Sequence, residues 1–387
     1  MLENLITSMP MYVCTFWSVL LLIDVARNRQ TAKKRLLTYM VTAALLYAGH
    51  YIFFNHQTAL MPFTDTIYVM SNLAVFPLYF MYIKEITEPA WNHRWQWLLL
   101  APALLVGVTV GMLYVLMSPV ETSDFIETYL YRNQMAGLEG LMWWQGVVHH
   151  AAKIVFALQI PPILVLGLRK IRQYNESVEA SYADTDDKRL HLMTTILLLF
   201  VVTSFMSFGA NLLGRYRFAD SLWLLIVPSL VFSVLQFMLG YAGYHQKFTV
   251  SDLLCDMQIT EDTQDTDAEE ESIQQDKMAD LQQKLTDTVS RNKLYLQPEL
   301  KITDVANLLH TNRTYVSRVL KEQIGTTFAD FINHQRIDYA CQLMEQQPQL
   351  PAAEVASQSG FSSQSSFYRN FKLYKGCSPK DYQPAQT

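Results

Sequence analysis

Two short stretches near the end of the chain repeat one pattern of hydroxyl, amide and guanidinium side chains. Apolar residues at helical spacing mark an inner face in each, with Val316 and Val319 in the first and Phe367 and Phe371 in the second. The residues that then face outward in the early turns are Thr314, Ser317, Arg318, Gln364, Ser365 and Arg369. Arginine can donate two hydrogen bonds to guanine O6 and N7, and glutamine can pair with an adenine edge. The chemistry predicted for these positions is the reading of base edges in a DNA groove.

A second set of cationic and aromatic side chains flanks these positions. Its members are Arg313, Lys321, Tyr368, Lys372 and Lys375. Such residues suit phosphate contacts, which position a protein on a duplex without specifying sequence. Residues 299–387 contain nine basic and eight acidic residues, so we expect modest nonspecific affinity and binding that depends on both stretches. The alternative for each exposed arginine is a purely solvated side chain.

Helix signals place both stretches in helix-turn-helix units. In the first unit, a short apolar helix begins near Thr303, Asn312 can cap the next helix, and that helix ends at Gly325. In the second unit, Val355 and Ala356 hold the matching apolar positions, Gly360 makes the turn, and Ser362 or Ser363 can cap the last helix. The segment Phe328–Met344 is predicted to be one connecting helix, on which Arg336 is expected to pair an acid or cap carbonyls rather than touch DNA.

Two motifs carry a family resemblance, RTYVSRVLKEQIGTTFADFINHQRIDYACQLM and GFSSQSSFYRNFKLYKGCSPKDY. Over Leu300–Tyr382, about a fifth of the chain, the sequence resembles the AraC-type regulators, bacterial transcription factors with two helix-turn-helix units joined by a long helix. Val319, Leu320 and Cys377 depart mildly from the family pattern, in ways that affect packing. The resemblance implies double-stranded DNA at a promoter or operator as a partner, and RNA polymerase if the protein is an activator. The layout resembles the membrane-embedded members that have an N-terminal multi-span region.

The first 246 residues are mostly apolar. The whole chain is 50% hydrophobic and only 17% charged, with a net charge of −5, against roughly 25% charged residues in soluble domains. Seven stretches are long and apolar enough to span a bilayer. They are Ser8–Val25, Leu36–Phe54, Asp65–Ile83, Trp97–Met117, Val147–Leu168, Leu190–Leu213 and Ser221–Tyr241. The alternative is seven buried core helices of a soluble protein, which the near absence of charged interruptions disfavours.

Basic residues in the loops predict the orientation of the spans. The first, third and fifth loops carry twelve Lys and Arg residues, and the second, fourth and sixth carry three. The positive-inside rule therefore places the odd loops and the C-terminus in the cytoplasm and the N-terminus outside. The predicted location is the bacterial cytoplasmic membrane, with membrane lipid as a partner and the DNA-binding domain in the cytoplasm.

The sequence predicts three regions: residues 1–246 as a seven-helix transmembrane domain, 247–298 as an acidic linker with a connecting helix, and 299–387 as the DNA-binding domain. The run Glu261–Glu271 indicates a solvated spacer. The following stretch places Met278, Leu281, Leu285 and Val289 on one helical stripe. This stripe either pairs two copies into a homodimer or packs on its own C-terminal domain, and the sequence favours neither.

Ionisable groups within the spans raise the question of a site there. A signal-sensing pocket open to the outside would use His50, Asn72, His149, His150 and Lys153. Asp24 and Asp65 are further ionisable groups in the spans. The alternative is that these groups simply reach the polar interface. We predict no metal and no cofactor, because neither the histidines nor the four scattered cysteines have ligand spacing.

The sequence therefore predicts an all-α fold, a seven-transmembrane-helix bundle followed by a tandem helix-turn-helix domain. The leading hypothesis is a membrane-anchored, one-component transcriptional regulator that couples an unidentified signal ligand to promoter binding. The rival is a membrane transporter or receptor whose helical tail is regulatory or docks proteins. We expect no enzymatic activity, because no hydrolase, zinc-protease, P-loop or kinase signature is present.

Overall fold

The computed structural model describes residues 2–28, 30–88, 93–186, 188–213, 222–246, 249–250, 252–253 and 274–382. Every named element within these ranges is a helix, which confirms the predicted all-α fold. The acidic run Glu261–Glu271 and the sixth loop lie outside the described residues. The chain divides into two compact units, residues 1–172 with 190–247 and residues 173–189 with 248–387.

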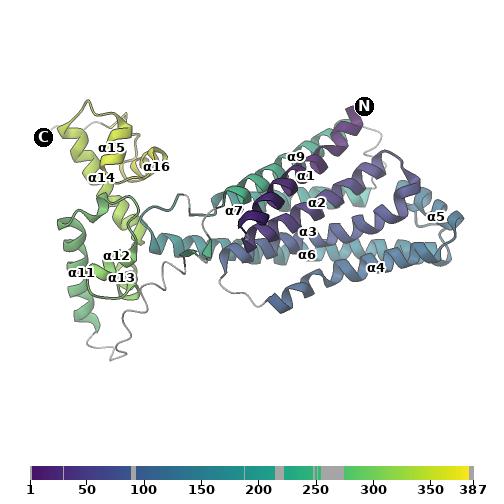
Figure 1. Cartoon of the computed structure of the whole chain (residues 1–387), viewed down its shortest axis with the longest axis horizontal. Coiled ribbons are helices and arrows are strands. Elements are labelled where there is room, and N and C mark those ends of the chain that lie inside the picture. The colour runs from purple at the N-terminus through teal and green to yellow at the C-terminus, as the bar shows by residue number, and fades with distance from the viewer. Residues whose placement is uncertain are drawn as a thin grey trace. The chain divides into compact units, whose positions relative to one another are not determined.

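The first unit is a bundle of long helices (Figure 1). Its elements are α1 (Leu2–Asn28), α2 (Thr31–Phe54), η1 (Thr58–Leu60), α3 (Met61–Thr87), η2 (His93–Leu100), α4 (Ala101–Leu116), α5 (Pro119–Phe125), η3 (Ile126–Tyr131), α6 (Gly140–Ser181, which continues into the second unit), α7 (His191–Leu213) and α9 (Leu222–His245). Helix α1 packs on α2 and α9, and α3 packs on α2 and α4. A hydrogen bond from Tyr39 Oη to Gln236 Oε1, 3.1 Å long, joins α2 to α9 inside the bundle.

Among the described residues, six helical segments are long and apolar enough to cross a membrane, and Leu192–Phe205 is a shorter apolar helix. Helix α3 is the buried centre, with Tyr79 and Ile83 fully covered. The outer helices instead leave large apolar side chains uncovered, among them Leu105 and Val115 on α4 at 69% and 85% exposure. Membrane insertion and the count of seven spans stay predictions.

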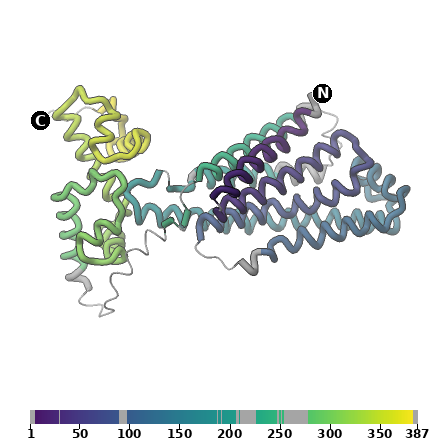
Figure 2. The backbone as a smooth tube through the Cα atoms, viewed as in Figure 1, coloured from purple at the N-terminus to yellow at the C-terminus, as the bar shows by residue number. Residues whose placement is uncertain are grey.

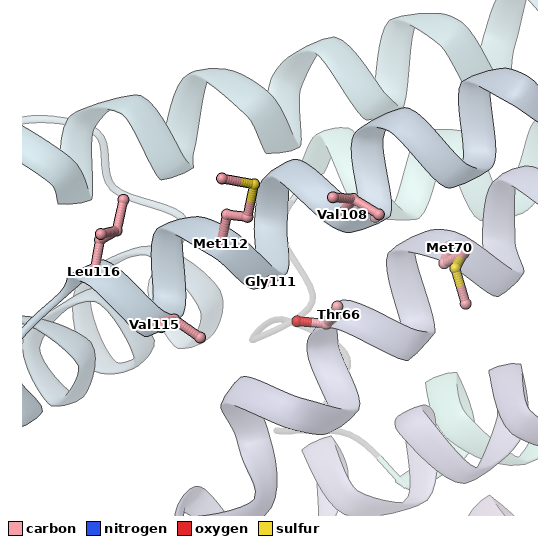
Figure 3. A pocket seen from close by; sticks show the side chains of 8 residues that line it. Thr66, Met70, Val108, Gly111, Met112, Val115 and Leu116 are labelled. Atoms are coloured by element: carbon pink, nitrogen blue, oxygen red, sulfur yellow. The ribbon is translucent and has the colours of Figure 1, made fainter.

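An apolar groove of about 400 Å³ separates part of α3 from α4 (Figure 3). It is lined by Thr66 and Met70 of α3 and by Val108, Met112 and Leu116 of α4. The hydroxyl of Thr66 donates to the carbonyl of Pro62 at 2.8 Å, so the groove offers a ligand almost no free polar group. Its lining suits an acyl chain or a packed side chain rather than a polar signal.

The second unit contains the short helices of the C-terminal third. They are α11 (Gln274–Arg291), η4 (Leu294–Leu296), α12 (Ile302–Leu308), α13 (Arg313–Val319), η5 (Leu320–Ile324), α14 (Phe328–Gln346), α15 (Ala352–Gln358) and α16 (Gln364–Lys375). Met278, Leu285 and Val289 of α11 are buried in one core with α12, α13 and the first half of α14. Of the two alternatives for this stripe, the structure has the packing on its own domain, as the tube of Figure 2 shows for α11 beside α12 and α13.

A second core joins the rest of α14 to α15 and α16. Helix α14 begins at Phe328 and ends at Gln346, two residues beyond the predicted connecting helix. Its first half contributes Phe328 and Ile332 to one core, and its second half contributes Ile337 and Ala340 to the other. The long helix therefore links two small cores, each of which holds one pair of short helices.

Candidate nucleic-acid interface

Helix α13 presents the first predicted set of base-reading residues. Asn312 caps the helix, since its side-chain oxygen accepts a hydrogen bond of 3.0 Å from the backbone N–H of Tyr315. Val316 and Val319 are fully buried as predicted, and the helical turns continue through η5 to Gly325 at φ +75°. Thr314 is exposed, and Ser317 and Arg318 are half-exposed beside it. The guanidinium carbon of Arg318 lies 5.9 Å from the Tyr315 ring centre.

Helix α16 presents the second set in the same way. Ser363 is its cap, with its hydroxyl accepting a 3.1 Å hydrogen bond from the backbone N–H of Ser366. Phe367 and Phe371 are fully buried. The outward residues Gln364, Ser365 and Arg369 are exposed. Each predicted reading helix thus carries its polar residues on the face opposite its core.

Arg369 is engaged by an acidic residue from a distant part of the chain. Its guanidinium forms an ion pair with Asp186, which lies between α6 and α7. Asp184 contacts the hydroxyl of Ser362, next to the cap of α16. This arrangement could not be predicted from the sequence, because these partners are more than 170 residues apart.

The predicted phosphate-contacting residues fall into different environments. Lys321 and Lys372 are exposed. Arg313 is half-buried, and its Nε lacks a hydrogen-bond partner among the described residues. Tyr368 is half-buried and packs edge-on against Phe367, with ring centres 5.8 Å apart.

Lys375 differs from the other members of this set. Its ammonium donates a 2.9 Å hydrogen bond to Asp338 of α14, which raises the pKa of Lys375. A lysine held in this way serves the packing of α16 on α14 in the free protein. Whether any member of the set touches DNA stays a prediction.

Arg336 is buried between the two small cores. Its Nε donates to the carbonyl of Tyr295 and one Nη donates to the carbonyl of Gln297, both at 2.7 Å. Its guanidinium also lies 5.5 Å from the centre of the Phe361 ring. Burial lowers the pKa of Arg336 to about 10, so the side chain stays charged at neutral pH. Of the two roles predicted for Arg336, pairing an acid or capping carbonyls, the structure shows the second.

A buried polar cluster lies within the first unit. The Nε2 atom of His149 on α6 is 2.7 Å from a carboxylate oxygen of Asp65 on α3. The hydroxyl of Tyr114 on α4 donates to the same oxygen at 3.0 Å. Because His149 Nδ1 faces the carbonyl of Gln145 at 2.8 Å, that nitrogen must carry a hydrogen. The pair is therefore either imidazolium with carboxylate or neutral imidazole with protonated Asp65, and its net charge is zero in both forms.

The other four residues of the predicted sensing pocket have different surroundings. His150 contacts the Tyr129 hydroxyl at 3.2 Å, and the Lys153 ammonium is 5.6 Å from the Tyr129 ring centre. The Tyr129 ring also packs edge-on against His149. His50 instead packs edge-on against Tyr68, with ring centres 5.0 Å apart. Asn72 is half-buried on α3, two turns beyond Asp65.

Asp65 and Gln145 are the residues that the predicted pocket omitted. Asp65 was recognisable as an ionisable group in a span, but its partner on α6 is 84 residues away. Gln145 is fully buried, and its side-chain oxygen has no hydrogen-bond partner among the described residues. Among the described residues, no group of three or more His, Cys, Asp or Glu side chains could hold a metal ion.

Comparisons with known proteins converge on the C-terminal third. A family model described as a helix-turn-helix domain matches residues 305–385. An "Uncharacterized response regulatory protein" of Staphylococcus epidermidis is 31% identical over 94 residues, which are 24% of this chain and 37% of that protein. The "Probable transcriptional regulator LumQ" of Photobacterium leiognathi is 33% identical over 23% of this chain and 36% of its own length.

The "Transcriptional regulatory protein HptR" of Staphylococcus aureus is 30% identical over 24% of this chain and 36% of its own length. The chain thus spans little more than a third of the length of these curated relatives. No solved structure matches the chain. The similarity therefore supports a DNA-binding regulator through the C-terminal domain alone.

Proposed function

We propose that this chain, whose residues 305–385 form a helix-turn-helix domain of the AraC type, is a membrane-anchored regulator that binds promoter DNA in response to a signal at the membrane. One observation carries the proposal. The same chain contains two capped helices with polar outer faces, α13 and α16, and several long apolar helices. In a helix-turn-helix, the second helix enters the major groove and its early outward residues meet the bases.

The membrane half of the proposal rests on exposed apolar surface. Large monomeric soluble proteins rarely expose contiguous apolar patches beyond a few hundred Å². Leu105 and Val115 on α4, Leu158 on α6 and Phe16 on α1 are each more than half exposed, and they belong to helices of membrane-spanning length. The hydrocarbon core of a bilayer would cover these faces.

The signal would act on the buried cluster of Asp65, His149 and Tyr114. A carboxylate and an imidazole with one shared proton are costly in a bilayer unless they serve a function. The unsatisfied oxygen of Gln145 lies on the same helix, one turn before His149. These side chains offer hydrogen-bonding groups to a polar or protonated signal, whereas the groove between α3 and α4 offers almost none.

Substitution of the two reading arginines tests the DNA-binding half. The full chain in lipid nanodiscs would be used to select duplexes from a random pool, and affinity for the selected site would then be measured. We expect Arg318→Ala and Arg369→Ala each to cost about 1–3 kcal/mol of binding free energy and to relax base preference at one position. The reason is that each substitution removes a bidentate donor from a base edge.

Lys372→Ala is the matched control on α16. It should weaken binding evenly across sequences and reduce the slope of log affinity against log salt by about one. Arginine variants that keep both the affinity and the base preference of the unaltered chain would show that α13 and α16 do not read bases.

Reporter fusions test the predicted orientation. A fluorescent protein fused after Thr387 should fluoresce in a bacterial host, and alkaline phosphatase at the same point should be inactive, because the C-terminus is expected inside. Alkaline phosphatase inserted in the fourth loop, near Gly137, should be active. An active phosphatase after Thr387 would place the reading helices away from the chromosome and overturn the proposal.

A further inference from the structure

The segment between α6 and α7 is part of the DNA-binding unit. Ala183 is 1% exposed and belongs to the core that α11, α12 and α13 form. Its N–H donates to the carbonyl of Leu300 at 3.0 Å, and its carbonyl accepts from the side-chain amide of Asn333 at 3.3 Å. Tyr182 and Lys301 form an antiparallel bridge beside it. These backbone contacts anchor residues 182–183 next to the reading helices.

The residues that follow this anchor are acidic and reach α16. Asp186 forms an ion pair with Arg369, and Asp184 contacts the hydroxyl of Ser362. Arg369 keeps about half of its side chain exposed, while that of Asp186 is only 20% exposed. The Asp186 carboxylate therefore lies on the outward face of α16, where the edge of a base would lie in a complex, and the Asp184 carboxylate lies just before the first turn of that helix. A carboxylate accepts the same guanidinium hydrogen bonds as a phosphate oxygen or guanine O6.

We propose that Asp184 and Asp186 are an internal competitor for DNA, which occupies the reading face of α16 until the segment is withdrawn. This inference rests on the proposed function. Arg369 cannot bind Asp186 and a duplex at the same time. The measured affinity for DNA therefore equals the intrinsic affinity multiplied by the fraction of molecules in which the reading face of α16 is free. The competitor is displaceable, because a partly exposed ion pair is weak.

The position of this segment in the chain allows a signal in the first unit to act on the competitor. It directly joins α6 to α7, and α6 carries His149 of the buried cluster. A signal that shifts α6 or α7 would move Asp184 and Asp186 relative to α16. The fraction of molecules in which these residues cover the reading face of α16 would then change. Asp184 and Asp186 thereby connect the sensing half of the chain to its reading half.

The test measures duplex affinity for the full chain in nanodiscs, with a site selected by the unaltered protein. The Asp184→Asn/Asp186→Asn variant should bind about tenfold more tightly, because the neutral amides keep the shape of the segment and lose its charge. The control variant Glu176→Gln/Asp280→Asn removes two charges from the same unit at exposed positions away from α16. It should change affinity less than about twofold.

The direction of the change separates competition from a structural role. Asp186→Asn and Arg369→Ala break the same ion pair, yet the first should strengthen DNA binding and the second should weaken it. A pair that only stabilised the fold would shift both variants in the same direction. Equal affinity of Asp184→Asn/Asp186→Asn and the unaltered chain would overturn the competitor while leaving the proposed function intact.

A cysteine pair gives a second, reversible readout. Asp184→Cys/Ser362→Cys, in a background with Cys255→Ser and Cys377→Ser, should lose at least about tenfold in affinity on oxidation and regain it with a reductant. Oxidised protein that binds as tightly as reduced protein would also overturn the competitor. If no variant, oxidised or reduced, retards any selected duplex, the proposed function itself fails and the competitor with it.

Discussion

Arg336→Ala is expected to destabilise the C-terminal unit by on the order of 3–5 kcal/mol. The substitution removes the donors to the carbonyls of Tyr295, Gln297 and Pro298, the last at 3.3 Å. Arg336 is 1% exposed, so water does not replace those donors without opening the structure. A cavity of nearly the whole arginine side chain also remains beside the ring of Phe361.

The buried thiol of Cys341 reports this loss directly. Cys341 lies on α14, one turn beyond Ile337, and burial raises the pKa of its thiol, so it reacts with an alkylating reagent only when the unit opens. The rate of alkylation, read by mass spectrometry of the Cys341 peptide in the full chain, should rise by at least about a hundredfold for Arg336→Ala.

Two further variants bracket this result. Arg336→Lys keeps the charge but not the planar fork, so it should fall between the unaltered chain and Arg336→Ala. Arg291→Ala removes an exposed arginine that pairs with Asp287 on α11, and it should change the free energy of opening by less than about 0.5 kcal/mol. An Arg336→Ala rate close to that of Arg291→Ala would show that the carbonyl contacts contribute little.

Arg336 also fixes the two reading helices relative to each other. Its partners Tyr295 and Gln297 flank η4, which packs with the first core, and Phe361 belongs to the second core. Two helices that enter successive grooves must keep a set spacing. We therefore expect the loss of Arg336 to reduce DNA affinity beyond what the removal of either single reading residue does.

The C-terminal fold could be predicted because its signals are local. Asn312 caps a helix three residues before its partner N–H, Gly325 ends that helix at positive φ, and Phe367 and Phe371 lie one turn apart. The connection of these elements by one long helix followed from a continuous apolar pattern. The sequence left open whether Arg336 pairs an acid or caps carbonyls, and the contacts with Tyr295 and Gln297 decide for the carbonyls because those residues lie on a separate segment.

The contacts that matter for regulation could not be predicted because they join distant segments. Asp186 meets Arg369 across 183 residues, and Asp65 meets His149 across 84. The stretch around Asp184 has the composition of an ordinary polar loop, so nothing local distinguishes it from solvent-exposed chain. Lys375 likewise has the pattern of a phosphate-binding lysine until Asp338, on another helix, is placed beside it.

Gly360→Ala is the second large effect, with an expected loss of about 2–5 kcal/mol in the stability of the unit. Gly360 has φ +82°, and a Cβ atom there would lie 2.5 Å from the carbonyl oxygen of Tyr295 and 2.7 Å from Cα of Leu296. Both are backbone atoms of η4, which Arg336 holds in place through the same carbonyl. The added methyl group therefore forces the turn before α16 away from the first core.

Gly376→Ala separates the steric part of this effect from the conformational part. Gly376 has a similar φ of +75°, but a Cβ atom there would meet nothing within 4 Å. It should cost only about 1 kcal/mol, from the left-handed backbone alone. Alkylation of Cys341 measures both variants, and Gly360→Ala should react at least about fivefold faster than Gly376→Ala. Equal rates would mean that η4 does not press on the turn. The spacing of the two reading helices would then depend on Arg336 without support from Gly360.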